Sequence, residues 1–118
     1  MQAILKQIHA ADADIVLTKY QPEDPDFFDL DLCLLIGASD KEGADIFYLT
    51  ICTPKWFDEQ NFKAPVRGYL LVDCFNLDQI KTKIQHCIEQ ASGNSWHEIA
   101  NQINQFALWE FDGYCQRE

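Results

Sequence analysis

The residues best suited to chemistry are two carboxylates, Asp29 and Asp31, which stand two positions apart in an alternating stretch of the sequence. In a β-strand, side chains two positions apart point to the same face. Two carboxyl groups held this close can raise one another's pKa and act as a hydrolytic acid–base pair. The simpler interpretation, which we prefer, is that both form the solvated face of a strand.

The other reactive side chains do not complete a catalytic or metal site. Zinc is held by three or four His, Cys or acidic ligands at characteristic short spacings, whereas the three histidines, His9, His86 and His97, are scattered. Cys87 directly follows His86, but adjacent residues on a helix point in different directions, so the imidazole cannot activate that thiol. There is no P-loop, dinucleotide fingerprint or nucleophile elbow. The sequence therefore predicts no enzyme, no metal and no cofactor.

The cysteines indicate a reducing compartment. Five are present, none in a C-x-x-C pair: Cys33, Cys52, Cys74, Cys87 and Cys115. An odd count, with no secretory signal in residues 1–13, predicts free thiols. Four lie in expected strands or helices, where cysteine behaves as a small hydrophobe. No apolar run approaches the roughly 20 residues of a membrane helix, so we expect a cytoplasmic protein that does not engage a membrane.

The stretch from Phe28 to Thr53 positions the two carboxylates and predicts a β-hairpin. Large apolar residues occupy every second position of both halves, and a polar link between Gly37 and Gly43 joins the halves. The first half has Leu30, Leu32, Leu34 and Ile36 on one face. The second half has Phe47, Leu49 and Ile51 on one face and Ile46, Tyr48, Thr50 and Cys52 on the other. We expect this hairpin to form the centre of an antiparallel sheet.

The remaining elements predict an α+β domain. Residues 3–9 are expected to form an edge strand, and residues 54–60 a single helical turn that begins at a proline. Residues 68–75 are almost continuously apolar, which predicts a central or doubly buried strand. Two helices follow, capped by Asn76 and Ser95, and Gly93 is expected to end the first. The 118 residues predict one domain, an antiparallel sheet of about four strands with two C-terminal helices packed on one face.

Net charge is −10, and it is concentrated in the first third of the chain. Residues 12–45 contain ten acidic side chains and two lysines, a local charge of −8. Such a field repels nucleic acid, whose binding needs Lys and Arg, and it attracts a basic partner. The alternative is that the acidic residues only keep the protein soluble.

Several motifs in combination resemble the immunity protein 8 family of bacterial polymorphic toxin systems. The resemblance runs from about Pro22 to Tyr114, and its most specific part is Cys-Thr-Pro-Lys-Trp at residues 52–56. The other motifs are Pro22-Glu23-Asp24-Pro25, Leu35-Ile36-Gly37, the strand from Gly68 with Asp73, Trp96, and Trp109-Glu110-Phe111 with Tyr114. The resemblance implies a small α+β protein that binds and neutralises a cognate toxin without catalysis.

Because many such toxins are nucleases with basic active sites, we hypothesise that acidic residues supply the toxin-facing surface, with aromatic anchors among them. The acidic candidates are Glu23, Asp24, Asp26, Asp29, Asp31, Asp40, Glu42 and Asp45. The aromatic candidates are Tyr48, Trp56 and Tyr114, although Trp56 is better explained by core packing. Two alternatives stay open: a non-catalytic adaptor in a bacterial complex, and a small-molecule enzyme or binder. The sequence leaves open whether the protein is a monomer or a homodimer.

Overall fold

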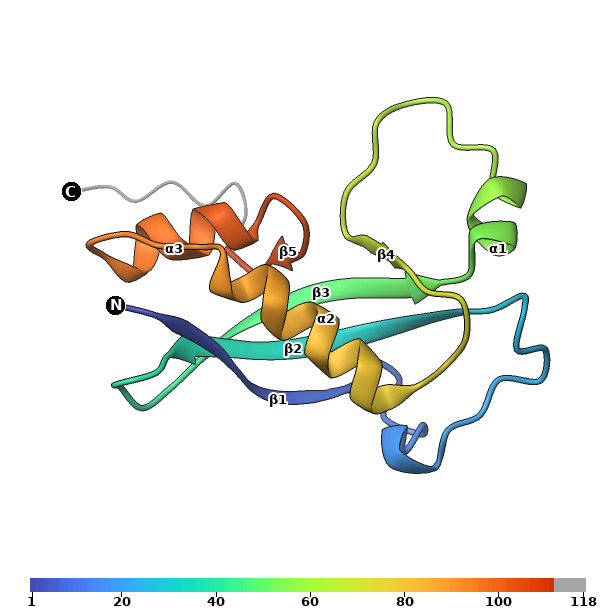
Figure 1. Cartoon of the computed structure of the whole chain (residues 1–118), viewed down its shortest axis with the longest axis horizontal. Coiled ribbons are helices and arrows are strands. Elements are labelled where there is room, and N and C mark those ends of the chain that lie inside the picture. The colour runs from blue at the N-terminus through green and yellow to red at the C-terminus, as the bar shows by residue number, and fades with distance from the viewer. Residues whose placement is uncertain (112–118) are drawn as a thin grey trace.

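The computed structural model describes residues 1–111, and its architecture is the expected α+β arrangement (Figure 1). A mainly antiparallel sheet carries two C-terminal helices. The elements in chain order are β1 (Ala3–Ala10), a 3-10 helix η1 (Leu17–Lys19), β2 (Asp29–Ala38), β3 (Asp45–Cys52), α1 (Pro54–Glu59), β4 (Tyr69–Leu71), α2 (Leu77–Glu89), α3 (Trp96–Ile103) and β5 (Leu108–Trp109). No helix in the described part of the chain is long and apolar enough to cross a membrane.

The predicted hairpin, β2 and β3, lies at the centre of the sheet. The strand order is β1-β2-β3-β4, and β1 and β2 are both antiparallel to their neighbours along the chain. The last residues of β3 pair with β4, and Phe47 and Tyr48 pair with β5. Since β2 occupies the opposite side of β3, the two short strands share its remaining edge and lie end to end. Residues far apart in the sequence therefore meet along one strand.

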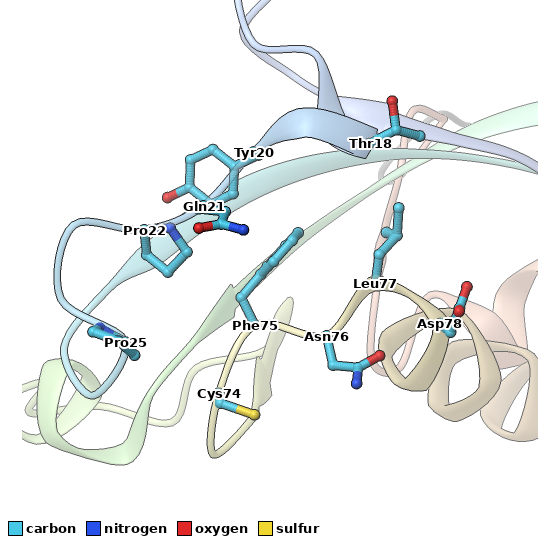
Figure 2. Close-up of a pocket in the computed structure, with 10 residues that line it drawn as sticks. All are labelled: Thr18, Tyr20, Gln21, Pro22, Pro25, Cys74, Phe75, Asn76, Leu77 and Asp78. Carbon is cyan, nitrogen blue, oxygen red and sulfur yellow. The ribbon is translucent and has the colours of Figure 1, made fainter.

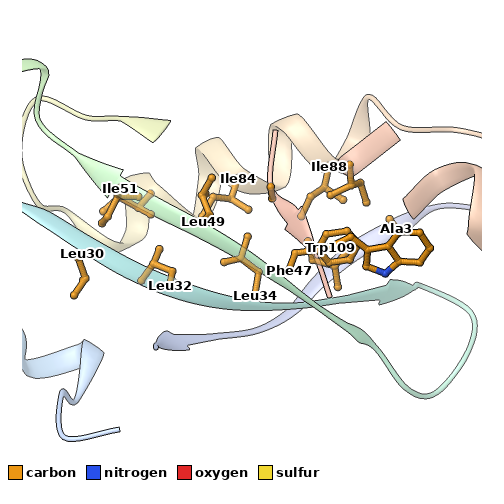
Figure 3. Packing of buried hydrophobic residues seen from close by; sticks show 14 of the residues in the cluster. Ala3, Leu30, Leu32, Leu34, Phe47, Leu49, Ile51, Ile84, Ile88 and Trp109 are labelled. Atoms are coloured by element: carbon orange, nitrogen blue, oxygen red, sulfur yellow. The ribbon is translucent and has the colours of Figure 1, made fainter. Parts of the chain in front are cut away.

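One hydrophobic core lies between the sheet and the helices α2 and α3. Ile36 and Phe47 from the strands are fully buried with Ile84, Ile88 and Ile103 from the helices, and all five belong to one cluster. Figure 3 shows Leu32, Leu34 and Leu49 of the sheet facing Ile84 of α2. The alternation of buried and exposed residues along β2 matches the predicted period of two. The expectation that both C-terminal helices pack on one face is confirmed.

Both predicted helix caps form, but the helix end at Gly93 was predicted wrongly. The side chains of Asn76 and Ser95 accept the backbone N–H groups of Gln79 and Glu98, at 3.1 and 3.2 Å. Helix α2 already ends at Glu89, and Gly93 does not have the positive φ of a glycine C-cap. A Cβ atom on Gly93 would come within 2.6 Å of Glu98 Oε2. The glycine instead makes room for Glu98, which accepts the backbone N–H of Asn94.

The strand predicted for residues 68–75 is the largest error in the predicted fold. Only Tyr69–Leu71 pair, parallel to β3, and they form an edge of the sheet rather than its centre. The pairing is short because β3 ends at Cys52, the partner of Leu71, and helix α1 begins at Pro54, so residues 72–75 have no strand beside them. Val72 is the buried residue of this run, whereas Cys74, expected inside a strand, is exposed. An apolar run alone did not reveal how much of β3 was available for pairing.

Candidate binding surface on the open face of the sheet

The face of the sheet turned away from α2 and α3 carries a row of polar and aromatic side chains, which we call the open face. Strand register places Asp31, Thr50 and Tyr69 side by side across β2, β3 and β4. The next row joins Cys33, Tyr48 and Leu108 across β2, β3 and β5. We define the open face by His9, Asp29, Asp31, Cys33, Tyr48, Thr50, Tyr69, Leu71 and Leu108.

Two carboxylates, Asp29 and Asp31, project from the open face at the beginning of β2, and both are exposed. The Thr50 hydroxyl donates a hydrogen bond to Asp31 Oδ1 at 2.7 Å, which fixes one oxygen of that carboxylate. Partial burial, and secondarily the charge of Asp31, raise the pKa of Asp29 above its usual value. The predicted placement of both carboxylates on one strand face is confirmed.

The cysteines beside these carboxylates are free thiols of low reactivity. Cys52 is fully buried opposite Asp29, and burial together with that charge raises the pKa of its thiol to about 11. Burial, and then the charge of Asp31, also raise the pKa of Cys33. Since the thiolate is the reactive form, neither residue is a useful nucleophile at neutral pH. The other described cysteines, Cys74 and Cys87, are also free, and Cys115 lies outside the described residues.

Replacing Asp29 by asparagine is expected to stabilise the protein more at neutral pH than at acid pH. A carboxyl group whose pKa is raised by folding binds protons more tightly in the folded state. Its contribution to stability therefore falls as pH rises from the unfolded pKa through the raised folded pKa. Urea unfolding of the wild type and of Asp29→Asn at pH 3 and pH 7 measures the difference. A variant that loses stability relative to the wild type on going from pH 3 to pH 7 would contradict this prediction.

Apolar side chains accompany the carboxylates on the open face. The exposed fractions of Tyr48, Leu71 and Leu108 are 44%, 45% and 37%. Trp56 of α1 is half-buried and stacks on Tyr69, with ring centroids 6.4 Å apart. Grouped exposed side chains of this kind, unlike scattered ones, are typical of a surface that binds another protein.

The structure divides the hypothesised toxin-facing residues into separate groups. Asp29, Asp31 and Tyr48 share the open face, and Trp56 joins them through Tyr69. Glu23, Asp24 and Asp26 lie exposed in the loop that leads into β2. Asp40 and Glu42 are exposed in the turn at the other end of β2, and ten residues of strand span roughly 30 Å. Tyr114 lies outside the described residues.

Asp45 has a different environment from the other acidic candidates. It pairs with Ile36 in the register of β2 and β3, which places it on the core side of the sheet. One oxygen, Oδ2, accepts hydrogen bonds from Trp96 Nε1 at 2.7 Å and from Trp109 Nε1 at 2.9 Å. The carboxylate thus joins the beginning of β3 to α3 and β5.

The sequence analysis missed the apolar residues that β4 and β5 bring to the open face: Tyr69, Leu71 and Leu108. Tyr69 and Leu71 stand two positions apart, a signal that was present but hidden by the continuous apolar run around them. Leu108 reaches the open face only because β5 pairs with β3, a contact between residues 60 positions apart along the chain. Gly68 permits this approach, since a Cβ there would meet Leu108 Cγ at 3.0 Å.

The open face combines a carboxylate pair with exposed aromatic and aliphatic side chains, a composition suited to binding another protein. Within residues 1–111 there is no group of three or more His, Cys, Asp or Glu residues that could hold a metal ion. The carboxylates lie on a strand face with exposed aromatic and aliphatic neighbours. A family model described as Immunity protein 8 matches residues 3–114. The chain belongs to the immunity protein 8 family.

Family membership implies that this immunity protein neutralises a toxin. The matched residues extend beyond the resemblance noted in the sequence, because they also include β1, which begins at Ala3. No curated protein and no solved structure matches the chain.

Proposed function

We propose that this immunity protein neutralises its toxin by binding, through the open face, to a basic active site of the toxin. The class of toxin that fits this mechanism best is a nuclease. In this mechanism the immunity protein has no catalytic activity. Its carboxylates take positions that substrate phosphates would occupy, and its aromatic side chains exclude water around them. The complex forms in the cytoplasm.

The single observation that carries this proposal is the juxtaposition of Asp29 and Asp31 with Tyr48 on one uncovered strand surface. Among the residues that define the open face, His9 alone has a basic side chain. A surface of one charge sign increases the rate of encounter with an oppositely charged partner. The fixed hydrogen bond from Thr50 to Asp31 holds one carboxylate before the partner arrives, which lowers the entropy cost of binding.

The aromatic residues supply the attraction that charge alone does not. Binding energy at interfaces concentrates in a few residues, with Trp and Tyr over-represented. Tyr48 lies on the open face, two positions before Thr50 on β3, and its side chain is large and exposed. Trp56 and Tyr69 stack at the side of the same surface. The proposed interface therefore combines a carboxylate pair with an aromatic centre.

Co-expression with the cognate toxin tests the proposal. The wild-type protein is expected to restore growth, and Asp29→Lys/Asp31→Lys is expected to fail because it reverses the charge of the open face. The matched control, Asp40→Lys/Glu42→Lys, makes the same change in net charge in the turn at the opposite end of β2. It is expected to restore growth. Equal rescue by both variants would remove the open face from the mechanism.

A further inference from the structure

We propose that the groove between residues 18–25 and the beginning of α2 binds a short extended segment of the partner toxin, in which an apolar side chain is flanked by Lys or Arg. This inference rests on the proposed function and adds a second contact region to it. The groove is open, has a volume of about 530 Å³, and is lined by side chains of both chain segments (Figure 2).

The apolar floor of the groove is held in place before anything binds. Phe75 lies between the two segments (Figure 2), with its ring edge-on to Tyr20 at a centroid distance of 5.1 Å. The same ring contacts buried Phe28 edge-on at 6.3 Å, which connects the floor to the core. A floor fixed on two sides loses little freedom when a side chain packs on it.

The loop wall is also preorganised. Pro22 and Pro25 line it, and each fixes its own φ angle. Between them, Asp24 Oδ1 accepts the backbone N–H of Asp26 at 2.9 Å, and the backbone oxygen of Asp24 accepts the N–H of Phe27 at 3.2 Å. These bonds give the loop a defined turn, so its apolar side stays turned toward Phe75.

Charge on the two segments identifies the kind of side chain that fits. Residues 18–26 and 73–78 together contain five carboxylates, at Glu23, Asp24, Asp26, Asp73 and Asp78, and one basic residue, Lys19. All five carboxylates are exposed. Asp78 lines the groove itself, and the other four stand beside its lining residues along the chain. An apolar floor with acidic surroundings favours an apolar side chain whose neighbours along the chain are cationic, because each part then meets its complement.

An extended peptide fits this groove better than a small molecule. Sites for small ligands enclose most of the ligand surface, whereas this groove is open to solvent. Its loop wall belongs to the acidic loop that leads into β2, whose first residue is Asp29 of the open face. The groove lies on the α2 side of the sheet, so a toxin bound to the open face would reach it by a segment that passes around the end of the sheet where β2 begins.

A matched pair of tryptophan variants tests the groove in the complex with the toxin. Gln21→Trp places a bulky side chain at the exposed rim of the groove, and Asn101→Trp makes the same kind of change on the exposed side of α3. Loss of one packed apolar contact is worth roughly a tenfold change in Kd, so Gln21→Trp is expected to weaken binding about tenfold. Asn101→Trp is expected to leave Kd within twofold. Glu23→Lys, which reverses a charge next to the lining residue Pro22, is a second variant and is expected to weaken binding severalfold.

Outcomes of this test separate the groove from the open face. If Gln21→Trp and Glu23→Lys both bind like the wild type while Asp29→Lys/Asp31→Lys does not, the groove proposal is wrong and the proposed function stands. If the two groove variants and Asp29→Lys/Asp31→Lys all bind the toxin like the wild type, both proposals are wrong.

A peptide titration tests the groove without the toxin. An acetylated pentapeptide amide, Arg-Leu-Lys-Leu-Arg, is added to the full chain, and NMR signals of Tyr20, Phe75 and Leu77 are followed. These signals are expected to shift, and the acidic counterpart Glu-Leu-Glu-Leu-Glu is expected to leave them unchanged. Equal shifts with both peptides, or none with either, would overturn the proposal. Sedimentation supplies a further contradicting result. If the wild type self-associates and Gln21→Trp does not, the occupant of the groove is a second copy of the chain and the proposal is wrong.

Discussion

Replacing Asp45 by alanine is expected to lower the free energy of unfolding by about 3 kcal/mol, because two indole N–H groups lose their acceptor. Trp96 and Trp109 both donate to the same oxygen of Asp45, and Trp109 is buried. Trp109 also stacks on Phe47 in the core, with centroids 6.1 Å apart. The loss therefore reaches the contacts that hold β5 and α3 against the sheet.

Urea unfolding measures this loss as a lower midpoint with an unchanged slope. Asp45→Asn keeps an acceptor oxygen at a similar position and is expected to cost about 1 kcal/mol, the net value of a weakened hydrogen bond. Asp40→Ala removes an exposed carboxylate from the neighbouring turn and is expected to change stability by no more than about 0.5 kcal/mol. An Asp45→Ala protein as stable as Asp40→Ala would show that the two indoles do not depend on this carboxylate.

Replacing Tyr48 by alanine is expected to weaken toxin binding about thirtyfold, which corresponds to the roughly 2 kcal/mol lost at a typical interface hot spot. Tyr48 is exposed at the centre of the open face, between Cys33 of β2 and Leu108 of β5. Because 44% of its surface is exposed and it points away from the core, truncation removes binding area without making a closed cavity in the core.

Titration calorimetry with the purified toxin measures this effect, and Tyr48→Phe distinguishes the ring from the hydroxyl. The phenylalanine variant keeps the apolar area and is expected to bind within about fivefold of the wild type. If Tyr48→Ala binds the toxin as tightly as the wild type and unfolds at the same urea concentration, the interface does not include Tyr48.

The central hairpin was predictable from the sequence because its periodicity is local. Alternation along residues 30–36 and 47–51 identified both the buried face and the face that carries Asp29 and Asp31. The caps at Asn76 and Ser95 were predictable for the same reason, since each depends on residues within one helical turn. Local patterns thus defined the elements that support the candidate site.

The position of Asp45 in the alternating pattern predicted its place on the core side of the sheet, but its charge led us to group it with the surface carboxylates. It stands two positions before Phe47 and so belongs, by the same alternation, to the core face rather than to the acidic surface. Its charge placed it among the toxin-facing candidates, whereas its partners, Trp96 and Trp109, are more than 50 residues away. A carboxylate in register with a buried strand face indicates an internal acceptor, and the two later tryptophans were its available donors.

The distribution of the other candidates depended on distances that composition does not give. Asp31 and Asp40 both contribute to the acidic first third of the chain, but β2 separates them by most of its length. The contributions of Tyr69 and Leu108 required knowledge of which strands pair with β3, and both pairings join residues distant in sequence. Net charge predicted an acidic surface, but only the sheet topology showed which part of it also carries aromatic residues.

The measurement that tests the central claim most directly is the association rate constant of immunity protein and toxin at several ionic strengths. For the wild type, the rate is expected to fall steeply as salt increases, because charge steering by the open face is screened. For Asp29→Lys/Asp31→Lys it is expected to be at least tenfold lower at low salt and much less sensitive to salt. Identical rates and salt dependence for the two proteins would contradict the claim that the toxin meets the open face.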